Sequence, residues 1–521
     1  MKHISHKDTQ RIKVTKFQTF FLILIISSSG FFGSYIGFYA HAISDYNSIA
    51  LNQQPPDPST FLEENTTLLY SMAMWYETNI AKYHMPHNMI VNTFFDSNTS
   101  VGNPLYYHAE YDSAEWTGNY LVAEASRYAV HRRNGQSELA EQALYNISAV
   151  LEGIDLILHI SPNDGMARYV WPLEDYVLRY DLNNLRSSHY RVTYEGEEYV
   201  IVDDTSRDMH NGIIMGLGYT YYTVDNQTIR TEVKRLVERM IDILISRGWM
   251  YIDPEGDPNG TDLDVGLFLI GTSGVWTLAY LKVAELVNPE KYGPIYERCA
   301  HRLDYVNRGN YPSTSIFNLV QGYYGLLLDW EVLFILILLE QDPYLRTNYL
   351  QYLGGIYDLI KYDRTALFST MWLVLHGITQ DSEEEDQFVV EDIIDCLMRY
   401  YGAGQRLPGR DVPLDDTGIT NSISQKWLDF FSTGLGKILY PFSQSLFQFE
   451  DVSDEALTPD KRPQTDYLWS RSPYDYQDHN PSGYHEGPGV DYTIVYWLTQ
   501  LYNITSTPTN FDGEIEVIYG W

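Results

Sequence analysis

Basic residues are scarce in this sequence. The 521-residue chain has 35 Lys and Arg against 69 Asp and Glu, which gives a formal net charge of −34. A protein that binds a polyanion needs clustered Lys and Arg, so we expect no nucleic-acid partner. The negative charge is dispersed, and its densest stretch is Asp381–Asp386 (DSEEED). Such dispersed acidity is typical of a solvated surface that keeps a protein soluble.

Cysteine is rarer still, because Cys299 and Cys396 are the only two. They could form a disulfide in an oxidising compartment, but two free buried thiols explain them equally well. The sequence also lacks H-E-x-x-H, paired C-x-x-C, G-x-S-x-G and P-loop motifs. His84 and His87 lie close together, yet two histidines without a third partner are poor evidence for a metal site. We therefore expect no metal and no cofactor.

The N-terminus indicates the cellular compartment. Five basic residues lie among the first 16 positions and precede Phe17–Tyr39, an apolar run without a charge. About 20 such residues suffice to span a bilayer core, and the basic flank should stay in the cytoplasm. The A-x-A pattern at Ala40–Ala42 offers a cleaved signal peptide as the alternative. The protein is therefore expected in the cell membrane with a single pass, or secreted if this segment is cleaved.

The predicted organisation has four parts. A basic cytoplasmic segment covers 1–16, a transmembrane signal-anchor helix or signal peptide covers 17–42, and a polar linker covers 43–59. One extracytoplasmic domain then occupies 60–521. N-x-S/T sequons agree with an exported glycoprotein, and they lie at Asn65, Asn98, Asn146, Asn226, Asn259 and Asn503.

The domain reads as a succession of helices with apolar residues at three- and four-residue spacing. Tyr190–Val202 instead predicts two short strands around Glu195-Gly196, and Glu514–Trp521 another strand. Stretches rich in Gly, Pro and Tyr, 402–421 and 452–488, predict long site-forming loops. Helices are expected at residues 60–83, 112–130, 137–159, 206–224, 227–247, 264–287, 295–303, 317–339, 343–360, 365–377, 385–400 and 491–502.

These elements predict an all-α fold, an (α/α)6 toroid of helical hairpins with a small β-hairpin insertion. A helical solenoid is the main alternative, but its repeats should recur at a fixed period. The sequence has no such period.

The helix expected from Asp112 begins with acidic residues. Asp112 and Glu115 have the D-x-x-E spacing of a capping box. A second interpretation is that a helix N-terminus presents these carboxylates to a substrate in ionised form. Trp116 is then either a platform for a sugar ring or a buried side chain. Glu124 and Arg127, one turn apart, predict an ion pair.

A second acidic helix start occurs at residues 203–212 (DDTSRDMHNG). Thr205 or Ser206 could cap this helix, but capping does not account for so many polar residues. Adjacent carboxylates raise one another's pKa and a flanking Arg lowers it, which separates paired acids into a proton donor and a base. The residues concerned are Asp203, Asp204, Arg207, Asp208, His210 and Asn211.

A third cluster lies near the C-terminus, between Tyr467 and Tyr492. Glu486 stands in a loop rich in Gly and Pro with no helix to cap, and loops of this kind position functional groups. Asp491 is expected to be the N-cap of the last helix. The cluster also contains Trp469, Arg471 and His485.

Four motifs together resemble a known superfamily. They are D-x-A-x-W-T-G-x-Y-x-x-A-x-A-x-R-Y (Asp112–Tyr128), G-M-A-R (Gly165–Arg168), D-T-S-R-D…G (Asp204–Gly212) and L-W-x-R-S-P…E-G-P-G-x-D-Y (Leu468–Tyr492). This order is similar to that of exported helical-toroid proteins of the six-hairpin glycosidase-like superfamily, which includes glycoside hydrolases and, more distantly, polysaccharide lyases. The resemblance implies the toroid fold, and it carries no catalytic motif onto particular residues of this chain.

The function expected is that of a carbohydrate-active protein, a glycoside hydrolase that uses paired carboxylates on an oligo- or polysaccharide. The alternatives are a polysaccharide lyase with His210 or a Tyr as base, and a non-catalytic glycan-binding or cell-envelope protein. No oligomeric state is predicted. The expected catalytic residues are Asp112, Glu115, Asp204, Asp208 and Glu486, and the expected substrate-binding residues are Trp116, Arg207, His210, Asn211, Trp469, Arg471 and His485.

Overall fold

The chain divides into two compact units, 1–54 and 55–521. In a computed structural model, the described residues all belong to the second unit. They are residues 55–97, 102–108, 112–180, 182, 185–186, 188–203, 205–252, 258–262, 273–308, 323–377, 384–400, 456–462, 467–471, 473 and 484–506. The predicted segments 1–16 and 17–42, the loop 402–421 and the strand 514–521 lie outside them, as do most of the linker 43–59 and most of the loop 452–488.

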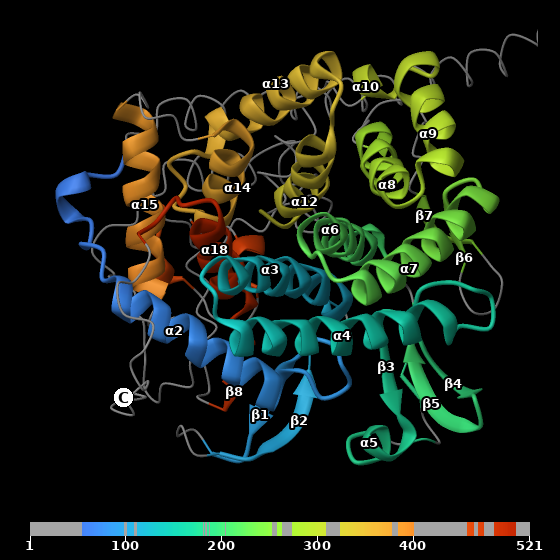
Figure 1. Ribbon diagram of the computed structural model, residues 1–521. Helices are drawn as coiled ribbons and strands as arrows, with labels where there is room; N and C mark the ends of the chain where they lie inside the picture. The colour runs from blue at the N-terminus through green and yellow to red at the C-terminus, as the bar shows by residue number, and fades with distance from the viewer. Residues whose placement is uncertain are drawn as a thin grey trace, which may run out of the picture. The chain divides into compact units, whose positions relative to one another are not determined.

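The described part of the chain is mostly helical, which confirms the predicted class (Figure 1). Short 3-10 or π-helical turns are η1 (Pro58–Thr60), η2 (Ile80–His84), η3 (Arg298–Arg302), η4 (Pro459–Lys461) and η5 (Leu468–Ser470). The α-helices are α2 (Thr66–Asn79), α3 (Ser113–Arg133), α4 (Ser137–His159), α5 (Leu173–Val177), α6 (Arg207–Thr223), α7 (Gln227–Ser246), α8 (Ser273–Val287), α9 (Pro289–Glu297), α10 (Tyr305–Arg308), α12 (Tyr323–Leu339), α13 (Pro343–Ile360), α14 (Ala366–His376), α15 (Glu384–Tyr400) and α18 (Val490–Leu501).

Helix boundaries follow the local sequence where a cap is present. Helix α13 covers the predicted residues 343–360 because Asp342 accepts hydrogen bonds from the backbone N–H groups of Tyr344 and Leu345. Pro343 fills the first helical position, where no N–H is needed. Asn226 caps α7 in the same way.

The β structure is small and antiparallel. Its strands are β1 (Asn92–Phe95), β2 (Pro104–His108) and β8 (His485–Glu486) in one sheet, β3 (Tyr169–Pro172), β4 (His189–Tyr194) and β5 (Glu197–Val202) in a second, and β6 (Met250–Ile252) with β7 (Pro258–Asp262).

The β4–β5 hairpin confirms the strands predicted around Glu195-Gly196. Both turn residues have positive φ, 51° and 91°, as a tight hairpin turn requires. The sheet β2-β1-β8 was not predicted, because its two-residue third strand comes from a distant part of the chain and leaves no local pattern.

Every second long helix belongs to one continuous series of contacts. Helix α3 packs on α6, and the contacts continue through α8, α12, α14 and α18, which returns to α3. Helices between these in sequence pack against members of the series, as α4 does on α3 and α13 on α14 (Figure 1).

The contact between α3 and α6 depends on glycine. A Cβ atom on Gly118 would lie 1.9 Å from the carbonyl oxygen of Gly212, and one on Gly212 would lie 2.5 Å from the carbonyl oxygen of Glu115. The two backbones therefore touch, and Figure 1 shows the helices side by side. This close approach brings together the starts of α3 and α6, which carry Glu115 and Asp208.

Gly118→Ala should therefore lower the free energy of unfolding by about 1–3 kcal/mol, since two backbones must separate to admit the methyl group. Gly355 is the matched control, because it lies within helix α13 and a Cβ there meets nothing within 4 Å. Gly355→Ala should stabilise the protein by about 0.5–1 kcal/mol through helix propensity. Urea denaturation of both variants measures the difference, and equal stabilities would show that the close approach is wrong.

Among the described residues, no helix is both long and apolar enough to cross a membrane. The prediction of a transmembrane or signal-anchor helix is corrected accordingly, and the segment 17–42 on which it rested lies outside the described residues. The very apolar α12 has only 17 residues, fewer than the roughly 20 needed. Its apolar side chains instead pack in the core, and it carries Asp329 and Glu331.

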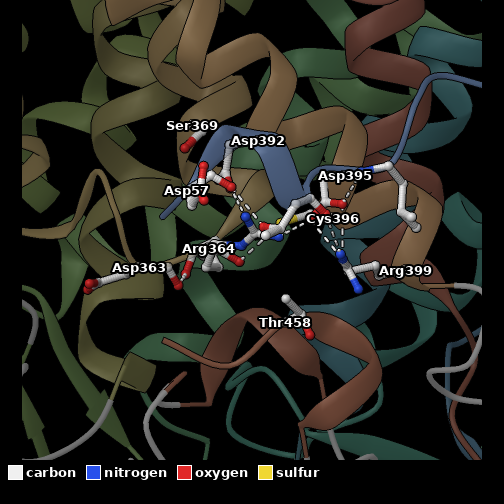
Figure 2. A network of polar contacts seen from close by, with 12 residues as sticks. Asp57, Asp363, Arg364, Ser369, Asp392, Asp395, Cys396, Arg399 and Thr458 are labelled. Carbon is white, nitrogen blue, oxygen red and sulfur yellow. Dashed lines mark hydrogen bonds and ion pairs between the residues drawn. The ribbon is translucent and has the colours of Figure 1, made fainter. Parts of the chain in front are cut away.

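A buried charge network joins the segment just before α14, helix α15 and the segment around η4 (Figure 2). Arg364 lies 2.8 Å from Asp392 and also pairs with Asp395. Arg462 donates hydrogen bonds of 2.6 Å and 3.0 Å to the carbonyl oxygens of Arg364 and Asp363. Burial raises the pKa of Asp392 to about 6, while the Arg364 charge opposes that shift. The network therefore ties together segments far apart in sequence.

Both cysteines are buried, and neither forms a disulfide. Cys396 lies in this network, where its Sγ contacts the carbonyl oxygen of Arg364 at 3.5 Å. Of the two readings left open by the sequence, that of buried thiols without a disulfide is confirmed.

The predicted ion pair within α3 is also confirmed. Arg127 contacts Glu124 at 3.1 Å and Glu77 of α2 at 3.6 Å, and all three side chains are buried. The pair is part of the core.

Candidate functional site: an acidic cluster where two helices begin

Three predicted carboxylates converge where α3 and α6 begin. Asp112, Glu115 and Asp208, called the acidic cluster below, each place one oxygen within 4.8 Å of one oxygen of each of the others. Glu115 and Asp208 are buried and Asp112 is half-buried. They come together because helices α3 and α6 pack closely at Gly118 and Gly212, which no local sequence pattern predicts.

The helix starts are not capped as predicted. Neither Asp112 nor Ser206, the N-cap residues of α3 and α6, makes a side-chain capping hydrogen bond. The hydroxyl of Ser206 instead donates to Asp208. Asp112 has φ −112° and ψ 0°, whereas a capping side chain usually stands on an extended residue. The capping-box interpretation is wrong, and the acidic side chains remain available for other roles.

Asp208 accepts a second hydroxyl hydrogen bond, from Tyr324 at the start of α12. Tyr324 is 40% exposed, so this pair lies at the solvent-facing side of the cluster. Both carboxylate oxygens of Asp208 therefore accept a hydroxyl hydrogen bond, which fixes the orientation of the side chain.

Glu331, also on α12, lies deeper. It accepts a 2.7 Å hydrogen bond from the amide of Asn119, which also donates to the backbone carbonyl of Glu115 at 3.1 Å. Among the described residues, Oε1 of Glu115 and Oε2 of Glu331 are buried without a hydrogen-bond partner. A buried polar atom without a hydrogen-bond partner lowers the stability of the fold. These two oxygens are therefore able to accept a further partner.

Burial and mutual repulsion shift the titration of these acids. Burial raises the pKa of Asp112 to about 6 with help from the charge of Asp208, while Arg168 and Arg471 oppose the shift. For Glu115, burial and then the Glu331 charge hold the pKa well above its usual range. Burial does the same to the pKa of Glu331, against the Asn119 hydrogen bond. Such perturbed acids mark a candidate functional site.

Aromatic side chains line the inner side of the cluster. Trp116 is only 3% exposed and stacks on Tyr467 with ring centroids 6.3 Å apart. Trp116 is therefore a buried side chain, the second of the two alternatives that the sequence left open. Tyr467 donates a 3.3 Å hydrogen bond to Asn119, and Tyr280 donates one of 2.5 Å to Asn211.

Asn211 and His210 are both buried and each contacts a backbone carbonyl. The Asn211 amide also donates to the backbone carbonyl of Leu328 at 3.3 Å. His210 is buried with Nδ1 3.0 Å from the carbonyl oxygen of Ser206, and burial lowers its pKa. Asp203 is buried as well, and Asp204 lies outside the described residues.

Arg207 is the exposed cation at the start of α6. Its guanidinium lies 5.3 Å from the ring centroid of Trp276 on α8, and the Trp276 indole donates a 2.9 Å hydrogen bond to Asp329. Arg207 is therefore a candidate for binding a polar ligand beside the cluster.

The C-terminal cluster is divided between two places. Trp469 is buried and its indole donates to the backbone carbonyl of Asp491 at 2.7 Å, so it is not an exposed stacking surface. Arg471 acts on Asp112 electrostatically. Asp491 is not the N-cap of α18, because Gly489 holds that position with φ 80°. A Cβ on Gly489 would meet the ring of Tyr76 at 2.1 Å.

Glu486 does not belong to the acidic cluster. It lies on β8, where it accepts from the Asn79 amide at 2.5 Å and contacts His84 Nε2 at 3.1 Å. His485 stacks on Phe94, with ring centroids 4.6 Å apart. The structure thus gives both residues partners within the β2-β1-β8 sheet and α2–η2.

His84 and His87 have different partners. His87 contacts the Tyr169 hydroxyl at 2.6 Å and Asp175 at 2.7 Å, whereas His84 contacts Glu486. The two histidines therefore do not share a set of ligands.

Sequence reasoning missed Glu331, Tyr324 and Asn119. A signal for Glu331 was present, because α12 reads LLLDWEVLFILILL and is otherwise apolar. A carboxylate in such a run is costly to bury unless it is satisfied, so it marks a functional or paired group.

The chain was also compared with known proteins. No family model, no curated protein and no solved structure matches it. The resemblance to six-hairpin glycosidases therefore stays a prediction, and the role of the site is argued from its residues.

Proposed function

We propose that residues 55–521 form an (α/α)6 toroid that acts as a glycoside hydrolase on an oligo- or polysaccharide. Support for the toroid comes from the series of contacts that returns to its start, since its members alternate along the chain with the helices packed against them. In this proposal the inner helices are α3, α6, α8, α12, α14 and α18, and the outer helices are α2, α4, α7, α9, α13 and α15.

The observation that carries the proposed activity is the convergence of Asp112, Glu115 and Asp208, with oxygens within 4.8 Å of one another. Glycoside hydrolases need two carboxyl groups across the scissile bond, about 5–5.5 Å apart in retaining enzymes and roughly 6.5–9.5 Å apart in inverting ones. The short separation favours a retaining mechanism.

In the first step, Asp208 attacks the anomeric carbon while Asp112 donates its proton to the glycosidic oxygen. The carbon–oxygen bond breaks, the leaving sugar departs as an alcohol, and a glycosyl ester forms on Asp208. In the second step, Asp112 takes a proton from water, water oxygen bonds to the anomeric carbon, and the ester bond to Asp208 breaks. Both residues then return to their starting forms.

These roles follow from the contacts. Asp208 is the nucleophile because it accepts hydroxyl hydrogen bonds from Tyr324 and Ser206, which hold its carboxylate in one orientation. Asp112 is the acid and base because it is the least buried of the three and can exchange protons with water. Arg207 is proposed to bind the substrate.

A panel of glycans incubated with the full chain tests this proposal. New reducing ends and products of retained anomeric configuration are the expected result. Unsaturated products that absorb in the near ultraviolet would indicate a lyase instead. Binding without any turnover would indicate a non-catalytic glycan-binding protein and would overturn the proposal.

A further inference from the structure

The carboxylates of the acidic cluster have the spacing of metal ligands. One oxygen each from Asp112, Glu115 and Asp208 lies within 4.8 Å of the other two. Calcium binds protein oxygens at about 2.3–2.6 Å, so two of its ligands can stand about 4.6–5.2 Å apart on opposite sides of the ion. A separation within 4.8 Å is therefore compatible with all three oxygens being ligands of one Ca²⁺, once the side chains adjust slightly around the ion.

A second observation points to a ligand in the same place. Within the described part of the chain, Glu115 Oε1 is buried and accepts no hydrogen bond, and the whole residue is only 1% exposed. Leaving a buried carboxylate oxygen unsatisfied costs free energy, and a bound cation would supply the missing partner. Glu331, whose charge acts on Glu115, adds a fourth carboxylate nearby.

From the geometry and the unsatisfied oxygen together, we infer that the acidic cluster is a calcium site with Asp112, Glu115 and Asp208 as ligands. The ligands are all hard oxygen donors, which suit Ca²⁺ better than zinc or copper. Mg²⁺ demands ligand oxygens at about 2.0–2.1 Å in strict octahedral geometry, so it should bind more weakly here.

The hydroxyls of Ser206 and Tyr324 support this arrangement from outside. Both donate to Asp208, and hydrogen bonds to a ligating carboxylate fix its orientation. Backbone rigidity comes from the α3–α6 contact at Gly118 and Gly212, so the ligands are held in place before the ion arrives.

Calcium at this site would engage the oxygens that the proposed hydrolysis needs. A carboxylate bound to the ion is not free to attack the sugar or to carry the catalytic proton, so Ca²⁺ should inhibit hydrolysis. This consequence rests on the proposed function, whereas the binding of calcium itself does not.

Calorimetric titration of the chelator-treated full chain with CaCl₂ tests the inference. The expected result is one calcium per chain, and Glu115→Gln should weaken that binding by about tenfold or more because a charged ligand is lost. The matched control is Glu138→Gln, since Glu138 occupies the first turn of α4 as Glu115 does that of α3 but is exposed. The control should bind calcium like the wild type.

Two results would overturn the inference: no stoichiometric binding by the wild type, or unchanged binding by a folded Glu115→Gln variant. Circular dichroism checks the fold of each variant. If Glu115→Gln fails to fold, Asp112→Asn is titrated in its place, because that residue is half-buried, and the same two results apply. Calcium binding together with no glycan hydrolysis by the calcium-free, chelator-treated chain would sink the proposed function alone, and hydrolysis without calcium binding would sink the calcium site alone.

Discussion

Asp208→Asn is expected to lower kcat for glycan hydrolysis by about 10³-fold or more, which corresponds to about 4 kcal/mol of transition-state stabilisation. The amide retains the shape of the side chain. Ser206 and Tyr324 donate to different oxygens of Asp208, so the amide oxygen can accept from one hydroxyl while the other hydroxyl must rotate to accept from the amide NH2 group. It cannot form the glycosyl ester, so substrate binding should change much less than kcat. Steady-state kinetics on the best substrate from the glycan panel measures both parameters.

Asp225→Asn is the matched control for this variant. Asp225 also accepts a hydroxyl hydrogen bond from a tyrosine, Tyr128, but it lies outside the cluster and its side chain is 63% exposed. Its replacement should leave kcat within a factor of about two, as surface substitutions rarely exceed ±0.5 kcal/mol. If the Asp208 variant keeps wild-type kcat, Asp208 is not the nucleophile.

Arg364→Ala should lower the free energy of unfolding by about 3–5 kcal/mol. The guanidinium pairs with both Asp392 and Asp395, and all three side chains are at most 3% exposed. Because the site is buried, water does not solvate the two carboxylates once the positive charge is removed. The substitution leaves two carboxylates buried together, and it removes the polar contacts of Arg364 that Figure 2 draws. Equilibrium denaturation in urea measures the loss.

Arg235→Ala provides the comparison. Arg235 also contacts two carboxylates, Asp155 and Glu232, but its side chain is 45% exposed. Water screens such pairs, so the expected loss is below about 1 kcal/mol. Similar losses for the two variants would mean that burial does not decide the strength of these ion pairs.

Most helices could be predicted from sequence because their signals are local. Apolar periodicity and caps such as Asp342 lie within the helix or next to it, and α4 and α13 have the predicted bounds. The β4–β5 hairpin was predictable for the same reason, since Glu195-Gly196 is a two-residue turn. Strand β8 was not, because its hydrogen bonds go to β1, a segment far away in the chain.

The candidate site was predictable only in part. Acidic residues near two helix starts drew attention to Asp112, Glu115 and Asp208, and the structure places these three together. The same reasoning added Glu486, which pairs with His84 in a different set of contacts. The sequence around Glu486 indicates that its carboxylate caps no helix. It does not indicate which residues surround that carboxylate in the folded protein.

By itself, the sequence determined most of the long helices and which carboxylates stand at the helix starts, since both follow from residues close along the chain. Only the tertiary structure decided that α3 and α6 touch through Gly118 and Gly212, that Glu331 on α12 lies near Glu115, and that Asp112 and Ser206 leave their caps unmade. The physical reason is that burial and mutual repulsion depend on neighbours in space. The acidic cluster acquires its chemistry only when the helices pack.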